Sequence, residues 1–158
     1  MDVINADESL PPEDILWLQA MGDRAVELLV AQDERARTPH EVRVRLVGDT
    51  EMASAHEQYS NVEGTTDVLT FDLSGDGETL DVDIMVCVDE AHRQGDRLGH
   101  ETKREALLYM IHGMLHCLGY DDHDDASYLR MHAAEDEVLQ RLGVGVTFAA
   151  KKMNKDSL

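Results

Sequence analysis

The chain has 158 residues, of which 42% are hydrophobic and 30% are charged. This composition is typical of a globular protein and excludes an intrinsically disordered chain, and no apolar run approaches the roughly 20 residues that a membrane-spanning helix needs. The formal net charge of −19 argues against a broad nucleic-acid-binding surface, because such surfaces normally carry a basic stripe.

We expect a single domain covering residues 1–158, because a chain of this length buries a sizeable core. Residues 1–10 and 143–158 show no periodicity and are expected to be loose termini. The N-terminal region lacks the basic stretch and apolar run of a secretory signal, and the two cysteines, Cys87 and Cys117, fall in apolar segments. These features predict a cytoplasmic protein without disulfides.

The spacing of apolar residues predicts the secondary structure. Helical spacing follows Pro11-Pro12, which suit the first turn of a helix. Apolar and charged residues then alternate from Val42 to Leu46, as in a strand with one wetter face. A turn sequence at 74–77 separates two further strands. In chain order we expect a helix at 11–32, a strand at 41–47, a helix at 49–61, strands at 68–73 and 80–88, and helices at 89–94, 101–118 and 126–142.

The helix at 101–118 differs from the others, because it is apolar around most of its circumference from Ala106 to Leu118. Such a helix is typically buried at the centre of a protein. The strands do not alternate strictly with helices, as a doubly wound sheet requires, and two of them form a hairpin. This order predicts an α+β fold, with a small mixed β-sheet packed against helices.

The central helix carries two histidines, His112 and His116, four residues apart. This spacing puts both imidazoles on one helix face. Gly119 then ends the helix with a left-handed turn, and the returning chain brings Asp122 and His123. Three protein ligands and an open fourth position are typical of a catalytic zinc site. We therefore predict one bound Zn²⁺ ion, although two imidazoles and a carboxylate also suit iron or manganese.

Gly113 follows the first histidine, at the position where HExxH metallopeptidases carry a glutamate general base. A glycine accepts no proton, so this residue disfavours peptide hydrolysis. Glycine also costs about 1 kcal/mol relative to alanine inside a helix, which predicts that a neighbouring element approaches the backbone closely at Gly113. The motif supplies no general base, and the catalytic residues stay unassigned.

At this point the sequence resembles a known family. The run from His112 to His123, HGMLHCLGYDDH, resembles the HGxLHLxGYDH signature of the YbeY family of bacterial metal-dependent endoribonucleases in ribosomal RNA maturation. Residues 65–71, TTDVLTF, resemble the family's PTDVLSF, and Asp83-Ile84 resembles its Gly-Asp-Ile element. The resemblance covers roughly residues 40–142. It implies a mixed sheet packed against the metal helix, an rRNA precursor as substrate, and partners among small-subunit ribosomal proteins and an assembly GTPase.

The sequence departs from the family at two positions. The family's third histidine falls ten residues after the first, where this chain has Asp122, with His123 one residue further. Either Asp122 replaces the imidazole in register, or the loop bulges and presents His123. We favour Asp122, because an unshifted loop needs no rearrangement. The family's arginine after Tyr59 is Ser60 here, which removes a contact to phosphate.

Three further residues are expected near the metal: Ser60, Thr66 and Asp67. Asp67 begins a strand and is equally well explained as a turn carboxylate. Three other histidines are expected at the surface: His92, His100 and His132. Two functions remain in consideration. One is a metal-dependent endoribonuclease of the single-strand type that acts in ribosomal RNA maturation and ribosome assembly. The other is a non-catalytic ribosome-assembly factor whose metal is structural, which Ser60 supports. A metallopeptidase is a remote third.

Overall fold

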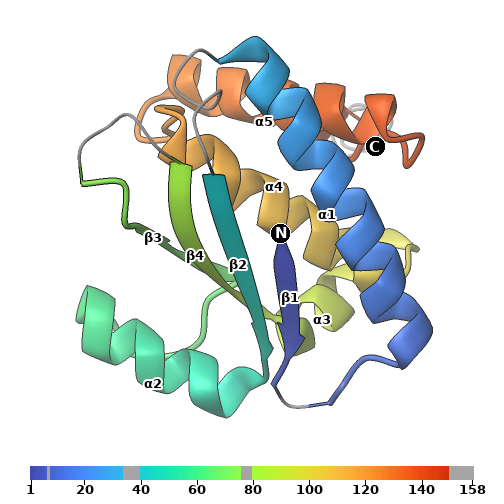
Figure 1. Ribbon diagram of the computed structural model, residues 1–158. Coiled ribbons are helices and arrows are strands. Elements are labelled where there is room, and N and C mark those ends of the chain that lie inside the picture. The colour runs from blue at the N-terminus through green and yellow to red at the C-terminus, as the bar shows by residue number, and fades with distance from the viewer. Residues whose placement is uncertain (7, 34–39, 76–79, 150–158) are drawn as a thin grey trace, which may run out of the picture.

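The computed structural model describes residues 1–6, 8–33, 40–75 and 80–149, which form an α+β fold (Figure 1). The expected helices and strands are present, so the predicted fold class is confirmed; the turn expected at 74–77 extends into residues outside the described part. The elements in chain order are β1 (Asp2–Asn5), α1 (Pro12–Gln32), β2 (His40–Val47), α2 (Asp49–Ser60), β3 (Val68–Asp72), β4 (Leu80–Cys87), α3 (Val88–Leu98), α4 (Thr102–Cys117) and α5 (Asp125–Arg141).

The described strands form a mixed sheet in the order β1-β2-β4-β3. β1 pairs with β2 and β2 pairs with β4 in parallel, whereas β3 and β4 form the expected antiparallel hairpin. β3 is therefore an edge strand. α4 contacts β3 and β4 on one side and α1, α3 and α5 on the others, so the predicted central helix is indeed central.

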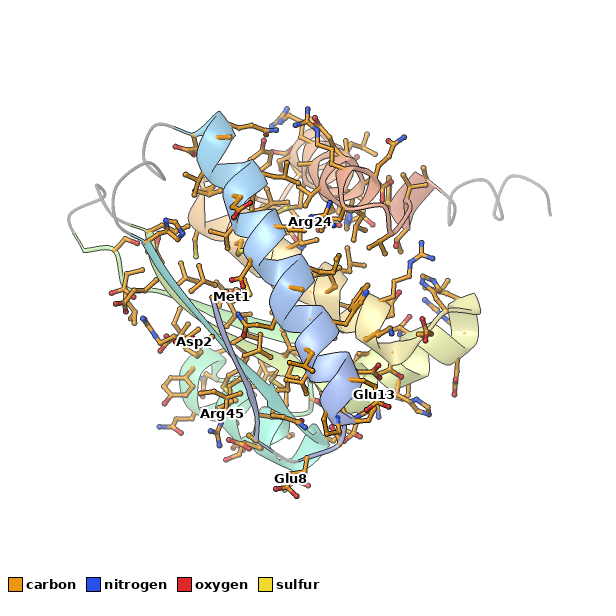
Figure 2. All side chains as sticks on the ribbon, turned by 45° about the vertical axis from the view of Figure 1, so that its right-hand side comes forward. Met1, Asp2, Glu8, Glu13, Arg24 and Arg45 are labelled. Carbon is orange, nitrogen blue, oxygen red and sulfur yellow. The ribbon has the colours of Figure 1, made fainter. Side chains whose placement is uncertain are left out.

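The expectation of a loose N-terminal arm at residues 1–10 is wrong. Asp2–Asn5 forms β1, in which Asp2 lies opposite Arg43 of β2. The backbone N–H of Val3 also donates to the Gln19 side chain of α1 at 3.1 Å. Figure 2 shows Met1 beside α1 and Glu8 on the turn that leads from β1 into that helix. Four residues are too few for an alternation pattern, so this strand depends on its partner.

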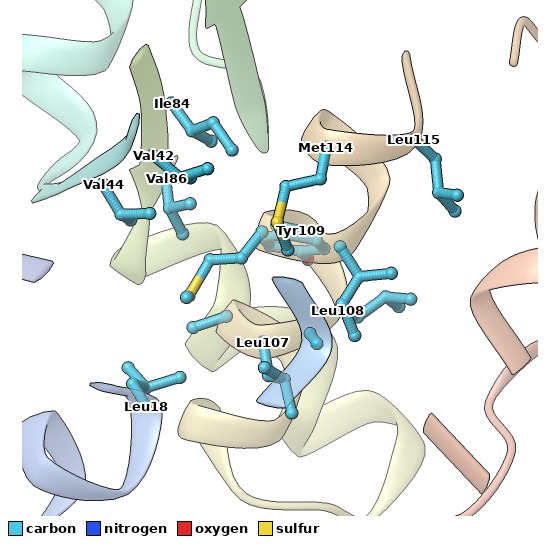
Figure 3. Packing of buried hydrophobic residues seen from close by; sticks show 14 of the residues in the cluster. Leu18, Val42, Val44, Ile84, Val86, Leu107, Leu108, Tyr109, Met114 and Leu115 are labelled. Atoms are coloured by element: carbon cyan, nitrogen blue, oxygen red, sulfur yellow. The ribbon is translucent and has the colours of Figure 1, made fainter. Parts of the chain in front are cut away.

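Alternation along the strands divides the core between the two faces of the sheet. On one face a large cluster joins β2 and β4 to α1, α4 and α5, and Figure 3 shows Ile84 of this cluster near Met114 of α4. On the other face a smaller cluster of Val47, Met52 and Cys87 lies under α2. Burial of each aliphatic side chain stabilises the folded state by roughly 1.5–3 kcal/mol, so α4 is held firmly against the sheet.

Gly113 lets α4 approach the hairpin closely, as its place in the motif predicts. A Cβ atom on this residue would lie 2.8 Å from Thr70 Oγ1 and 3.2 Å from Ile84 Cδ1. Any larger residue would push the helix away from β3 and β4. The glycine therefore sets the distance between the histidine-bearing turn and the edge strand.

The residues after α5 also differ from expectation. Residues 143–149 were expected to be loose, but Asp136 of α5, which is 8% exposed, accepts backbone N–H groups from Thr147, Phe148 and Ala149 at 2.8–3.0 Å. Arg104 of α4 donates to the carbonyls of Gly145 and Val146. This segment is thus fixed against α4 and α5, while residues 150–158 lie outside the described part of the chain. No helix among the described residues has the length and apolar character needed to cross a membrane.

Candidate metal centre

His112 and His116 lie one turn apart on α4 and point their rings at the same place. Their Nε2 atoms are 2.9 Å apart, and the ring planes are inclined by 84°. The side chains are 19% and 33% exposed, so the pair is reached from solvent although the helix around it is buried. The sequence spacing alone accounts for this geometry.

The other ring nitrogen of each histidine is held by a different kind of partner. His112 Nδ1 donates to Glu135 Oε1 of α5 at 2.5 Å, and His116 Nδ1 donates to the carbonyl oxygen of Tyr120 at 3.1 Å. A hydrogen bond at Nδ1 leaves the Nε2 lone pair available for a metal. Both imidazoles are therefore fixed in the tautomer that binds a cation through Nε2.

The turn after α4 supplies the carbonyl that orients His116. Gly119 has φ of +96°, its N–H donates to the His116 carbonyl, and the Tyr120 N–H donates to the Leu115 carbonyl. These two bonds define a Schellman motif, which favours glycine at the left-handed position. The motif reverses the chain and directs the following loop back over the histidines.

Asp122, on the returning loop, is the candidate for a third donor. Its Oδ2 atom lies 3.8 Å from His112 Nε2 and 4.0 Å from His116 Nε2, and the three donor atoms form a group that fits one metal ion. Ligands of a tetrahedral zinc ion lie roughly 3.3 Å from one another, a spacing that the observed distances bracket. We refer to His112, His116 and Asp122 as the metal triad.

His123 lies outside the metal triad. Its backbone N–H donates to Asp121 Oδ1 at 2.9 Å, and its exposed side chain lines a cavity beside β3. The hydrogen bond from the His123 N–H lowers the pKa of Asp121. Asp121 thus shapes the loop, and it is Asp122 that the loop brings to the histidines.

Sequence reasoning missed two residues of α5, Glu135 and His132. Glu135 is only 2% exposed, and its Oε2 atom accepts a hydrogen bond from His132 Nδ1 at 2.7 Å, so one carboxylate joins His112 and His132. His132 was expected at the surface but is 20% exposed. The available signal was that Glu135 shares a helix face with Met131, Val138 and Leu139, which are buried. A charge on a buried face needs a partner, so this position indicated a buried hydrogen bond or ion pair.

Burial and hydrogen bonding act against each other in the His112–Glu135 pair. Burial alone would lower the pKa of His112. The hydrogen bond and the negative charge of Glu135 raise this pKa by more than that, so the net shift is upward. Burial raises the pKa of Glu135, but its bonds to His112 and His132 lower it below the ordinary value. Glu135 is therefore a carboxylate that makes the His112 ring more basic, as is usual for partners of metal-binding histidines.

Two cavities meet at His112. The first, of about 490 Å³, lies towards α3 and includes Thr66, Asp67 and His132 in its lining. The second, of about 600 Å³, lies along β3 and includes Ser60, Asp67 and His123. Asp67 thus borders both, and Ser60 and Thr66 border one each. We refer to the two cavities together as the cleft.

The cleft is strongly acidic. Its described lining includes no lysine and no arginine. Ser60, which stands at the position of the family's arginine, is uncharged. The carboxylates that line the cleft are Asp67, Asp72, Glu90, Glu105, Asp122 and Glu135. A bound phosphate would therefore depend on a metal ion for compensation of its charge.

The chain is similar to known proteins. The family model described as Endoribonuclease YbeY matches residues 15–143. Proteins named endoribonuclease YbeY are similar to the chain: that of Macrococcus caseolyticus is 30% identical over 125 residues, covering 74% of this chain and 81% of the relative. That of Desulfitobacterium hafniense is 30% identical over 157 residues, covering 91% and 98%. The solution structure of TM1509 from Thermotoga maritima has the same fold, with a TM-score of 0.57 and 21% identity over 89% of each chain.

Proposed function

Because this chain belongs to the endoribonuclease YbeY family, we propose that it is a metal-dependent endoribonuclease that cleaves rRNA precursors during ribosome maturation. The observation that supports this most strongly is the metal triad at the junction of two open cavities. A structural metal is normally closed in by four protein ligands, whereas three ligands beside a cleft leave room for a substrate.

We propose Zn²⁺ as the metal, bound by His112, His116 and Asp122. When bound, the ion supplies Lewis acidity, which polarises a phosphoryl oxygen and lowers the pKa of a water molecule. The protein's own contribution is positional. Glu135 and the Tyr120 carbonyl hold the two imidazoles in the binding tautomer, and Gly113 keeps the triad close to β3.

The partners proposed from the family resemblance are a small-subunit ribosomal protein and an assembly GTPase, in the cytoplasm. A basic ribosomal protein would complement a chain with a net charge of −19, because opposite charges speed association and favour the correct partner. RNA bound to such a partner would reach the acidic cleft already partly neutralised.

A ribosome-assembly factor with a structural metal is the second candidate; the family match favours the endoribonuclease over it, and one observation points the other way. Ser60 and the acidic lining leave the cleft without a described lysine or arginine to stabilise charge on a phosphate. A metallopeptidase is not favoured, since Gly113 provides no general base.

A metal-titrated cleavage assay separates the two candidates. Metal-free protein is reconstituted with increasing Zn²⁺ and incubated with single-stranded RNA, and the initial cleavage rate is compared with metal content. We expect the rate to rise with occupancy in the wild type and in His92→Ala, whose side chain is 65% exposed on α3, but not in His112→Ala. Stoichiometric metal without cleavage in the wild type would favour the assembly factor.

A further inference from the structure

Three aromatic rings pack together near the metal centre, two from α5 and one from the segment that follows it. His132 stacks on Phe148 with ring centroids 4.6 Å apart and planes inclined by 13°, and Tyr128 packs edge-on against His132 at 4.3 Å. His132 lines the cleft, and its ring lies 6.3 Å from that of His112. We refer to Tyr128, His132 and Phe148 as the aromatic cluster.

Hydrogen bonds from two directions keep the aromatic cluster in place. The carboxylate of Asp136 accepts three successive backbone N–H groups at Thr147, Phe148 and Ala149, and His132 is tied through Glu135 to His112. The ring of Phe148 is thus positioned by backbone hydrogen bonds as well as by packing. Glu135 therefore links the aromatic cluster to the metal triad by hydrogen bonds.

Packing of the core does not account for the whole cluster. The Tyr128 side chain is 42% exposed. A tyrosine that closed the core would bury its ring and direct only its hydroxyl to solvent. Tyr128 thus adds exposed aromatic surface next to His132, the member of the cluster that lines the cleft.

The charge of the cleft indicates which ligand fits. RNA-binding proteins usually gain affinity from lysine and arginine contacts to phosphate, but the described lining of this cleft has neither. Stacking of bases on aromatic rings gives affinity without charge and tolerates any base. In a duplex both faces of a base are already covered, so only an unpaired nucleotide presents a free face.

We propose that the aromatic cluster is a subsite that stacks one unpaired nucleobase of the RNA, next to the phosphate at the metal centre. The inference rests on the proposed endoribonuclease function and adds to it a reason for selecting single-stranded RNA. Stacking takes the place of the missing arginine as a source of affinity, and it places the base at a fixed distance from the metal triad.

The test compares variants of the metal-loaded protein. Tyr128→Ala and Phe148→Ala remove one ring each, Tyr128→Phe keeps the ring, and Leu129→Ala removes a neighbouring apolar side chain that is 50% exposed on the same helix. Binding of a short unstructured oligoribonucleotide with a fluorescein label is followed by anisotropy before appreciable cleavage. The same variants are assayed for metal content, and for kcat and KM in cleavage.

We expect Tyr128→Ala and Phe148→Ala to weaken binding by about five-fold to a hundred-fold, the range of single-base stacking, with unchanged metal content. The loss should be the same at low and high salt, because screening acts on charges, and it should appear mainly in KM. Tyr128→Phe and Leu129→Ala should bind like the wild type.

An oligoribonucleotide with a single abasic position sharpens the test. When the missing base is the one that stacks, Tyr128→Ala should cause little additional loss, since the two changes remove the same contact. Wild-type affinity in both ring-removing variants, or an equal loss in Leu129→Ala, would overturn the subsite while leaving the endoribonuclease standing. A wild type that neither binds nor cleaves the RNA would overturn both.

Discussion

Helices α4 and α5 both build the metal centre, but they do so in different ways. α4 supplies His112 and His116 directly, at a spacing that belongs to the helix itself. α5 supplies Glu135, which holds the His112 ring and lies 23 residues away in the sequence. His116, by contrast, is oriented by a carbonyl only four residues away, in the turn that follows its own helix. The two histidines therefore depend on contacts of different range, one tertiary and one local.

The largest expected effect comes from removing either imidazole. His112→Ala or His116→Ala deletes one donor from a site with three, so each variant should lose most of its bound metal. Metal content of the purified proteins, measured by inductively coupled plasma mass spectrometry, checks this, with His92→Ala as the control. Full stoichiometric metal in both variants would show that α4 does not hold the ion.

Variants of Asp122 and His123, the two candidates for the third metal ligand, test the role of the returning loop. Asp122→Asn replaces an anionic donor that lies 3.8 Å from His112 Nε2 by a neutral one, and should weaken metal binding by more than the roughly 10–100-fold that loss of an outer partner costs. His123→Ala should have little effect, and Asp122→His should be tolerated because it restores the family's residue. Competition with a chromogenic chelator gives the affinities. The reverse pattern for Asp122→Asn and His123→Ala would assign the third ligand to His123.

The contribution of α5 is measured by Glu135→Gln. The amide keeps the shape of the side chain but removes the charge that holds His112, so we expect metal affinity to fall by roughly 10–100-fold. Glu137→Gln, an exposed change on the same helix that breaks only an ion pair with Arg141, is the matched control. Equal affinities in Glu135→Gln and the wild type would mean that the turn after α4 suffices, and that the two imidazoles do not differ in their support.

The same contrast explains how far the sequence alone could go. The α4 histidines, Gly113 and Gly119 were predictable, because helix spacing and left-handed turns are local properties. Glu135 was not, since its role arises only when α5 packs on α4. β1 escaped prediction for a similar reason: Asp2 finds its partner at Arg43, and four residues carry no periodicity of their own.

The segment 143–149 shows where a signal was present but hard to interpret. Its lack of periodicity suggested a loose end, yet Asp136 lies on the buried side of α5 and needs hydrogen-bond donors. Those donors are the backbone N–H groups of residues 147–149. A buried acid without a visible partner in the sequence therefore indicates that a nearby segment folds back onto it.

The last expected effect concerns Ser60, on the β3 side of the cleft, and is the smallest if the new contact stays exposed. Ser60→Arg restores the family's cation at the β3 side of the cleft and should strengthen RNA binding. A charge-assisted phosphate contact contributes roughly 1.5–3 kcal/mol if RNA excludes water from it, and nearer 1 kcal/mol if it stays exposed, as Ser60 is in the free protein. Because exposed charges are screened over about 8 Å at physiological ionic strength, the gain should shrink as salt rises.

Ser54→Arg, which adds the same charge at another exposed position of α2, separates a specific contact from a general reduction of the negative charge. RNA affinity is measured for both variants and the wild type across a salt series. A gain confined to Ser60→Arg at low salt means that the β3 side of the cleft contacts phosphate. Equal gains in both variants mean that only net charge changed, and the alignment of Ser60 with the family's arginine would then carry no functional meaning. Since stacking on α5 does not depend on salt and a phosphate contact does, the two sides of the cleft can be told apart in one titration.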